Sequence, residues 1–357
     1  MRPHLLVALT THGYGHLAQT APVLNALHRR MPALRLTVYS TLPHALLARR
    51  IEAPFDHIAR PADVGMCMKN AMEVDAAASA RAYATFHRDW EAAVAEDSRL
   101  LRERAPGAVL ANAPYRILAA AARLDIPAVA LCSLNWADLY AHFCGGEAGA
   151  ELILAQMRGA YAGARAFLRP APSMPMADLP NRIAIGPVAR LGQDRRAAIL
   201  HRLALPAEVR LILVSLGGVE SRLDVARWPA LPAVRWIVPA AWKADRADVL
   251  PFEGLDIDFV DALRSADALI TKPGYGSFVE AACNGVPVLY APRDDWPEQG
   301  VLEEWLRANA ACGRIRREQL EGGDFAAELA ALLSVRRRPP VAPDGIVQAA
   351  ERLAALF

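Results

Sequence analysis

The stretch that decides the fold is residues 271–300, TKPGYGSFVEAACNGVPVLYAPRDDWPEQG. Before it, residues 266–270 are almost all apolar, as in a strand that is buried on both faces. The apolar pattern breaks at residues 272–276 and resumes at helical spacing over residues 277–284. A second apolar run, residues 288–291, follows. The stretch therefore predicts a strand, a glycine-rich loop, a helix and a second strand, which is the βαβ unit of a parallel sheet.

The loop and the first turn of this helix suit a nucleotide. Lys272 supplies a positive charge, and Gly274 and Gly276 let the backbone approach an anion closely. The helix N-terminus adds N–H groups and the positive end of the helix dipole, which favour an anion by about 0.3–1 kcal/mol. One turn later, Glu280 lies on the same face as Ser277 and carries two oxygens suited to a ribose diol. The order of these groups predicts a phosphate followed by a ribose.

These residues resemble the UDP-glycosyltransferases of GT-B fold, whose plant members carry HCGWNS followed by xxE in the corresponding loop. The chain matches that motif at three positions, Gly274, Ser277 and Glu280. Tyr275 stands at the aromatic position, Lys272 replaces the histidine near the diphosphate, and Gly276 replaces the asparagine. The alternative is an ordinary βαβ unit with a glycine turn, because short motifs produce false matches.

Three further phrases extend the resemblance. Glu298 and Gln299 look like the acidic-residue-plus-glutamine pair that holds the donor sugar's hydroxyls, and a helix-capping pair is the alternative. Val260 lies in the phrase FVD, similar to one that borders the nucleobase in the bacterial transferase that adds N-acetylglucosamine to lipid-linked peptidoglycan precursors. Gly217 and Gly218 resemble the glycine-rich turn that lines the diphosphate, although glycine suits any βα turn.

Residues 256–258, DID, offer a competing interpretation, the DxD metal motif of the other large glycosyltransferase fold. Alternation places both carboxylates on one face of a strand predicted over residues 256–260. Two carboxylates alone rarely specify a divalent ion, and the strand leads into the phrase that resembles the nucleobase contact. We therefore expect a structural role for these aspartates, no bound metal, and no cofactor besides the nucleotide-sugar substrate.

The chain alternates strands and helices, which predicts parallel sheets with helices on both faces, and its 357 residues suffice for about two domains. One strand series ends near residues 182–186, a second begins at residue 210, and a single long helix is expected over residues 75–104. Together with the resemblance, this pattern implies an α/β protein of GT-B architecture, with two Rossmann-like, doubly wound domains facing a cleft and a hinge near residues 187–208. The expected parts are an acceptor-binding domain at residues 1–188 and a nucleotide-sugar-binding domain at residues 189–342. By analogy, a C-terminal helix at residues 343–357 packs back on the first domain.

Residues 10–18, TTHGYGHLA, link the first strand to the first helix and contain GxGxxA. A dinucleotide-binding loop would be followed by an acidic residue about twenty positions on. No Asp or Glu occurs between His16 and Glu52, which disfavours NAD and leaves NADP open. The resemblance offers another account, because Gly15 and His16 match the family's Gly-His phrase that places an acceptor-activating histidine, whereas His12 is expected to be idle.

By this resemblance, His16 is the general base that removes the proton of the acceptor hydroxyl. In plant-type members an aspartate supports the histidine, but here the strand over residues 108–111 runs into Asn112. An amide could orient the imidazole without stabilising the imidazolium by a charge. Either Asp63 or Asp138 takes the role of the aspartate, or the acceptor is acidic enough to need less help.

Composition limits the compartment and the partners. A net charge of +2 is too small to indicate a nucleic-acid or membrane-surface partner, so at most peripheral membrane contact is expected. With 54% apolar residues, both domains could bury full cores. No signal-peptide pattern or membrane-spanning run is found. The cysteines are odd in number and lack metal spacing, which indicates reduced thiols in a cytoplasmic protein; they are Cys67, Cys132, Cys144, Cys283 and Cys312.

The sequence thus predicts a metal-independent, inverting glycosyltransferase of the hexosyltransferase class. Its donor is a nucleotide diphosphate sugar, UDP-linked by the resemblance, and its acceptor is a small or lipid-linked molecule. Residues 60–75 and 133–143, which contain methionines and aromatic residues, are expected to build an apolar acceptor pocket. The alternatives are a nucleotide-sugar hydrolase or epimerase of the same fold and a non-catalytic sugar-nucleotide binding protein.

Overall fold

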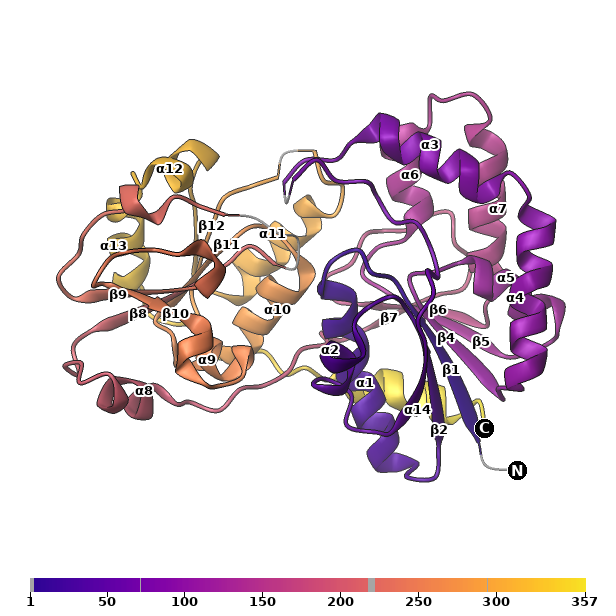
Figure 1. The fold of residues 1–357 in the computed structure, drawn as a ribbon, viewed down its shortest axis with the longest axis horizontal. Helices are drawn as coiled ribbons and strands as arrows, with labels where there is room; N and C mark the ends of the chain where they lie inside the picture. The colour runs from indigo at the N-terminus through magenta and orange to yellow at the C-terminus, as the bar shows by residue number, and fades with distance from the viewer. Residues whose placement is uncertain (1–2, 71, 218–221, 294) are drawn as a thin grey trace. The chain divides into compact units, whose positions relative to one another are not determined.

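The structure is a computed structural model that describes residues 3–70, 72–217, 222–293 and 295–357. The chain folds into two compact units (Figure 1). The first unit consists of Met1–Lys69, Glu73–Val188 and Pro343–Phe357, and the second of Asn70–Met72 and Ala189–Ala342.

The first unit is built on a parallel sheet of seven strands in the order β3-β2-β1-β4-β5-β6-β7. The strands are β1 (His4–Leu9), β2 (Arg35–Tyr39), β3 (Phe55–Ile58), β4 (Ala108–Asn112), β5 (Ala128–Leu131), β6 (Ala166–Pro170) and β7 (Arg182–Ile185). Its helices are α1 (Gly15–Arg30), α2 (His44–Ala48), α3 (Ala76–His87), α4 (Trp90–Arg104), α5 (Arg116–Arg123), α6 (Trp136–Cys144), α7 (Ala150–Ala162) and α14 (Gly345–Ala354). The strand order reverses between β1 and β4, and such switch points are where open α/β sheets bind ligands.

The second unit has its own parallel sheet, in the order β10-β9-β8-β11-β12-β13. The strands are β8 (Arg210–Ser215), β9 (Val234–Val238), β10 (Val249–Pro251), β11 (Ala268–Thr271), β12 (Val288–Tyr290) and β13 (Cys312–Arg314). Its helices are α8 (Arg196–Arg202), α9 (Phe259–Ser265), α10 (Tyr275–Asn284), α11 (Gln299–Asn309), α12 (Arg317–Gly322) and α13 (Ala326–Ser334). The predicted α/β class with two parallel sheets is confirmed.

Both faces of each sheet are covered, which explains the nearly continuous apolar strands. Strand β8 shows it: Leu211 and Leu213 join the core beneath α10, whereas Ile212 and Val214 join the core with α13. In the first unit, the last helix, α14, packs against α1, and its Leu353 lies in the core beside β1.

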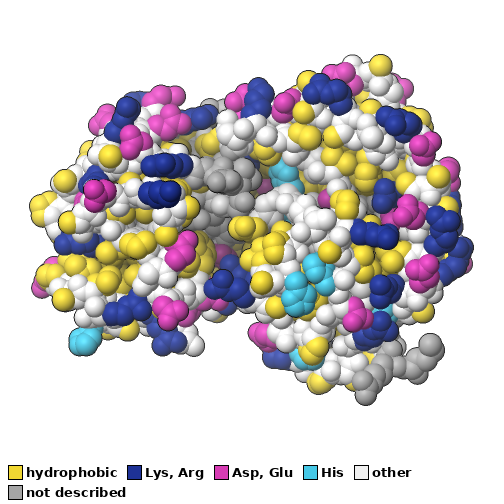
Figure 2. Space-filling model, in the orientation of Figure 1, with side chains coloured by type: hydrophobic (Ala, Val, Ile, Leu, Met, Phe, Trp, Pro, Cys, Tyr) yellow, Lys and Arg dark blue, Asp and Glu magenta, His cyan; other side chains and the backbone are white. Residues whose placement is uncertain are grey.

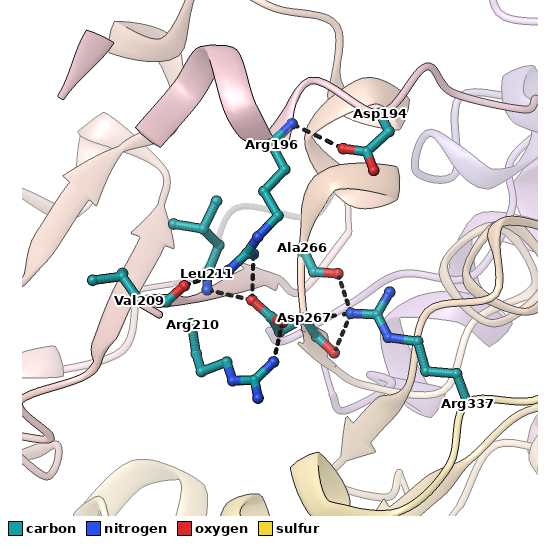
Figure 3. Close-up of polar contacts among 8 residues, drawn as sticks. All are labelled: Asp194, Arg196, Val209, Arg210, Leu211, Ala266, Asp267 and Arg337. Carbon is teal, nitrogen blue, oxygen red and sulfur yellow. Dashed lines mark hydrogen bonds and ion pairs between the residues drawn. The ribbon is translucent and has the colours of Figure 1, made fainter. Parts of the chain in front are cut away.

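Asp267, which directly precedes β11, is a buried carboxylate with a structural role (Figure 3). Its Oδ2 accepts hydrogen bonds from Arg196 Nη1 at 2.6 Å and from Leu211 N at 2.8 Å, and its Oδ1 accepts one from Arg210 Nη1 at 2.9 Å. Arg337 donates to the Asp267 carbonyl oxygen at 3.3 Å. These contacts tie α8, β8 and the segment after α13 to the amino end of β11, which is the end opposite to a ligand site in a parallel sheet.

Two predicted elements were wrong. The helix expected over residues 75–104 is divided into α3 and α4 between His87 and Trp90, because an apolar stripe can continue across a change of helix direction. Residues 256–260 do not form a strand: Asp256 has a left-handed φ of 50°, and Asp258 precedes α9. The few alternating residues there are also compatible with the helical spacing of Val260 and Leu263, which are both buried in α9.

Candidate functional site

In the first unit, the loop between β1 and α1 places His16 at the switch point of the sheet. Thr10 N donates to Asn112 O at 2.9 Å, which fixes the start of this loop against the end of β4. Gly13 has a φ of 77°, a conformation that favours glycine, and Gly15 begins the helix. His16 therefore lies in the first turn of α1, and 5% of its surface is exposed.

The His16 imidazole is held by Asn112. His16 Nδ1 lies 2.8 Å from Asn112 Oδ1. The Asn112 amide group Nδ2 donates to Thr20 Oγ1 at 3.0 Å and to Gln19 Oε1 at 3.3 Å. Because Nδ2 faces acceptors, Oδ1 must accept the hydrogen of His16 Nδ1. The tautomer fixed in this way leaves a lone pair on His16 Nε2, which is the arrangement that a general base needs.

Burial lowers the pKa of His16 to about 4, and the hydrogen bond to Asn112 raises it by less. The imidazole is therefore neutral at pH 7. The hypothesis that Asp63 supports His16 is wrong: the Asp63 carboxylate accepts from Thr10 Oγ1 at 2.8 Å and from Trp136 Nε1 at 2.7 Å. Asp138 does not take this role either, because His16 Nδ1 is bonded to Asn112.

Several residues of the expected acceptor pocket are parts of the core. Trp136 is fully buried, and its ring centroid lies 5.7 Å from that of His16. Tyr140 is also buried, with its ring 4.9 Å from Tyr83. Tyr14, by contrast, is 52% exposed, two residues before His16. Trp136 therefore packs at the imidazole, whereas Tyr14 is exposed.

In the second unit, the glycine-rich loop delivers the chain to the N-terminus of α10. Gly274 occupies the N-cap position without a side-chain cap, and Phe278 N is the amide that donates to Gly274 O at 3.1 Å. The helix begins at Tyr275, two residues earlier than the sequence predicts, so Gly276, expected in the loop, and Ser277 both lie in the first turn. The Tyr275 side chain packs in the core of the unit, and its backbone lies in the first turn of α10.

Lys272 stands between the ends of β11 and β8. A Cβ atom on Gly217, whose φ is 83°, would lie 3.9 Å from Lys272 Nζ, so the turn after β8 lies beside the ammonium group. The pKa of Lys272 is lowered to about 7, mainly by burial and also by the charge of Arg293, while the charge of Glu298 opposes the shift. An anion bound here would reverse that shift. Gly218, expected to line the same site, lies outside the described residues.

Glu280 lies one turn along α10 from Ser277 and is 5% exposed, and Asn284 Nδ2 donates to its carbonyl oxygen at 2.8 Å. Val260 does not occupy the strand expected for a nucleobase contact. It is a buried residue of α9 whose carbonyl oxygen would lie 2.1 Å from a Cβ on Gly192.

The segment after β12 carries a residue that the sequence interpretation missed. Arg293 is 7% exposed, and its guanidinium carbon lies 4.2 Å from the centre of the Trp296 ring. Burial lowers the pKa of Arg293 to about 10. Its backbone N donates to Gln299 Oε1 at 2.5 Å, and Trp296 Nε1 donates to Glu298 Oε2 at 3.3 Å. The position of Arg293 after an apolar strand was the signal in the sequence that could have identified it as a candidate site residue.

The Glu298–Gln299 pair does not act as a side-chain cap. Glu298 is at the N-cap position of α11, but no side-chain cap hydrogen bond is formed there. The Glu298 side chain is buried, at 3% exposure, and Gln299 is the first residue of the helix.

Other kinds of site find no support in the described residues. Within these ranges, no three His, Cys, Asp or Glu side chains come together as metal ligands would. None of the described helices combines the length and the apolar character that a membrane crossing requires. On the face shown in Figure 2, the described positive and negative side chains are interspersed in each unit, which differs from the basic stripe typical of nucleic-acid binding.

Comparison with known proteins bears on the fold of the chain. No protein-family model matches the chain. The chain is 24% identical over 335 residues to L-arabinokinase of Arabidopsis thaliana, covering 89% of the chain and 31% of that protein. It is also 24% identical over 230 residues to an uncharacterized glycosyltransferase of Methanopyrus kandleri, covering 60% of the chain and 64% of that protein. The chain thus spans less than two thirds of the length of either relative.

Among solved structures, the calicheamicin glycosyltransferase CalG4 is similar with a TM-score of 0.64 and 16% identity, covering 100% of this chain and 98% of that one. Arabidopsis thaliana UGT89C1 complexed with UDP has a TM-score of 0.60 and 16% identity, covering 99% and 94%. A putative UDP-N-acetylglucosamine 2-epimerase from Listeria monocytogenes has a TM-score of 0.58 and 15% identity, covering 99% and 95%. The chain has the GT-B fold that these proteins share, as the sequence predicts.

Proposed function

We propose that the protein is a glycosyltransferase that moves a sugar from a nucleotide diphosphate donor, UDP-linked, to a hydroxyl-bearing acceptor. The observation that carries the proposal is His16, a buried neutral imidazole whose Nδ1 is tied to Asn112 at 2.8 Å, at the switch point of a GT-B sheet. A dinucleotide-binding loop holds the pyrophosphate with glycines and the helix N-terminus, and this role does not require a buried histidine. An acceptor hydroxyl needs a base with a free lone pair.

The donor binds to the second unit in this proposal. The diphosphate lies at the N-terminus of α10 against Lys272 and the turn at Gly217, where the helix dipole and the ammonium group offset its charge. Glu280 accepts from the ribose hydroxyls one turn further along the helix. The Glu298 carboxylate accepts hydrogen bonds from hydroxyl groups of the donor sugar, and the Gln299 amide group donates to them. This arrangement supplies the positive charge for the leaving group from the protein, so we propose a metal-independent reaction.

The acceptor binds to the first unit, close to His16. His16 Nε2 takes the acceptor proton while the acceptor oxygen forms a bond to the anomeric carbon. The bond from that carbon to the diphosphate breaks on the opposite face, and the electron pair leaves with the nucleotide. This displacement inverts the anomeric configuration. Because Asn112 carries no charge, the imidazolium is not stabilised by an ion pair, and an acceptor with a relatively acidic hydroxyl suits it best.

The test begins with the donor, because it needs no acceptor. Calorimetry of UDP, dTDP and GDP should show binding of UDP to the wild-type protein, and Glu280→Ala should weaken it by about tenfold or more, since ribose hydroxyls lose their acceptors. The matched control is Glu303→Ala, because Glu303 is another buried glutamate of the second unit, hydrogen-bonded to Tyr290. Equal affinity in wild type and Glu280→Ala would contradict the assignment.

The catalytic part is tested with His16→Ala and a panel of phenolic and aliphatic acceptors. Transfer should fall at least about a hundredfold while UDP affinity is retained. Release of UDP from a UDP-sugar without any acceptor, at the rate of transfer, would identify a hydrolase instead. Conversion of the sugar without loss of UDP would identify an epimerase. Binding of UDP-sugars that is never followed by a reaction, in wild type and His16→Ala alike, would identify a non-catalytic binding protein.

A further inference from the structure

Arg293 is a buried cation at the carboxyl ends of β11 and β12. Ala291 N donates to Thr271 O at 3.1 Å, so the chain segments that follow the two strands start side by side. Lys272 is the next residue on one segment and Arg293 lies two residues along the other. The charge of Arg293 contributes to the lowered pKa of Lys272, which agrees with this neighbourhood. The site therefore contains a second positive side chain besides the lysine.

The guanidinium of Arg293 presents one complete edge. In the described part of the chain, its Nε and Nη2 atoms are buried and have no hydrogen-bond partner. These two atoms point to the same side of the planar group and form the fork that binds two oxygens of a carboxylate or phosphate at once. A buried charged group whose donors lack partners is costly to the fold, so such an arrangement requires an explanation.

The surrounding segment holds this side chain in place. Gln299 Oε1 accepts from Arg293 N at 2.5 Å, and Trp296 N donates to Arg293 O at 3.2 Å. The Trp296 ring covers one face of the guanidinium at 4.2 Å. With its backbone fixed on both sides and one face against an aromatic ring, the Arg293 fork is preorganised for an anion.

We propose that Arg293 is a specificity-determining residue of the donor site: its Nε–Nη2 edge binds two oxygens of an anionic group of the nucleotide sugar. This inference rests on the proposed function and goes beyond it, because it adds an anion subsite at the segment proposed to read the sugar. The anionic group is either a phosphate of the diphosphate or the carboxylate of a uronic acid sugar. Both offer the same pair of oxygens to the fork.

The experiment compares Arg293→Lys and Arg293→Met with wild type by calorimetry against UDP, UDP-glucose and UDP-glucuronate. Lysine keeps the charge and loses the fork, whereas methionine loses both. We expect both variants to lose about 10- to 100-fold in affinity for the ligand that carries the two oxygens. Loss for all three ligands assigns the fork to the diphosphate, and loss for UDP-glucuronate alone assigns it to the sugar carboxylate. Unchanged affinity for all three ligands in both variants overturns the proposal.

Arg246→Lys is the matched control, because Arg246 lies in the same unit and its Nη2 is bonded to Asp248 Oδ2 at 2.6 Å. Arg293→Met should melt at the same temperature as wild type or higher without ligand, since a buried cation is replaced by an apolar side chain. If Arg293→Met does not fold, Arg293→Lys decides the outcome.

The inference and the proposed function can fail separately. If wild type binds none of the nucleotides, the proposed function fails, and the Arg293 Nε–H resonance is followed in NMR spectra during titration with pyrophosphate and with glucuronate. A saturable shift of that resonance supports the anion subsite, and its absence with both probes overturns it.

Discussion

Replacing Asn112 by aspartate should convert His16 into a stronger base. The substitution keeps the shape of the side chain and puts a carboxylate where the amide oxygen now lies, 2.8 Å from His16 Nδ1. Two opposite charges about 4 Å apart interact by about 4 kcal/mol at an effective dielectric constant near 20. Since one pKa unit corresponds to about 1.4 kcal/mol, the upper limit is a rise of about three units. We expect the pKa of His16 to rise from about 4 by about one to three units.

The change also carries a cost in stability. Asn112 Nδ2 now donates to Thr20 Oγ1 and Gln19 Oε1, and an aspartate oxygen at that place can accept from Thr20 but faces the Gln19 oxygen. We therefore expect Asn112→Asp to lower the free energy of unfolding by about 1–3 kcal/mol above the new pKa of His16. At lower pH the ion pair with the imidazolium offsets part of this loss.

The assay is an NMR titration of the histidine ring carbons in wild type and Asn112→Asp, which needs neither donor nor acceptor. Asn25→Asp is the control, because Asn25 is a buried amide of the same helix, α1, that donates to the Arg50 carbonyl oxygen at 2.9 Å. A folded Asn112→Asp protein in which the pKa of His16 stays near 4 would refute the reasoning. Where an acceptor is known, turnover near pH 7 should rise by up to about tenfold, since a base works best with a pKa near the operating pH.

Three further predictions follow from the second unit. Because the pKa of Lys272 is lowered to about 7 and a bound diphosphate would raise it, UDP affinity should fall by up to about tenfold per pH unit as the pH rises from about 7 to 9. Calorimetry at several pH values measures this slope, and Lys272→Met should bind UDP weakly without it. A wild-type affinity that does not change with pH contradicts the prediction. Asp267→Asn should lower the free energy of unfolding by about 3 kcal/mol in urea denaturation, because its arginine partners lose their carboxylate; a loss below about 1 kcal/mol would show that these ion pairs contribute little. Gln299→Ala should weaken UDP-sugar binding at least about tenfold more than UDP binding, whereas an equal loss for both ligands would mean that Gln299 only holds the Arg293 backbone.

The order of elements and the position of the nucleotide motif could be predicted from the sequence. Buried parallel strands are apolar throughout, and helices show their own period, so each signal lies within a few neighbouring residues. The strand near residues 266–271 and the helix over residues 277–284 were predicted for this reason, although α10 begins two residues earlier, at Tyr275. Where the local signal was ambiguous, as at residues 256–260, the packing of Val260 and Leu263 decided in favour of a helix.

The chemistry of the site depended on residues that are distant in the chain. His16 and Asn112 are 96 positions apart, and the sequence alone could offer Asn112, Asp63 and Asp138 as partners without a choice between them. Their hydrogen bonds, and the burial that lowers the pKa of His16 to about 4, exist only once β1, β4 and α6 are assembled.

The environment of Arg293 also could not be predicted from the sequence. In the sequence Arg293 is one arginine among many in an Arg-rich chain, and its place after an apolar strand is a signal that does not reveal its burial or its partners. The sheet places it beside Lys272, the Trp296 ring covers it, and its Nε and Nη2 atoms are buried without a hydrogen-bond partner in the described part of the chain. The period of the apolar residues and the residues of the turns are local features, so the sequence itself determined the order of strands and helices. Desolvation and the choice of hydrogen-bond partner depend on which distant segments meet, so only the tertiary structure decided them.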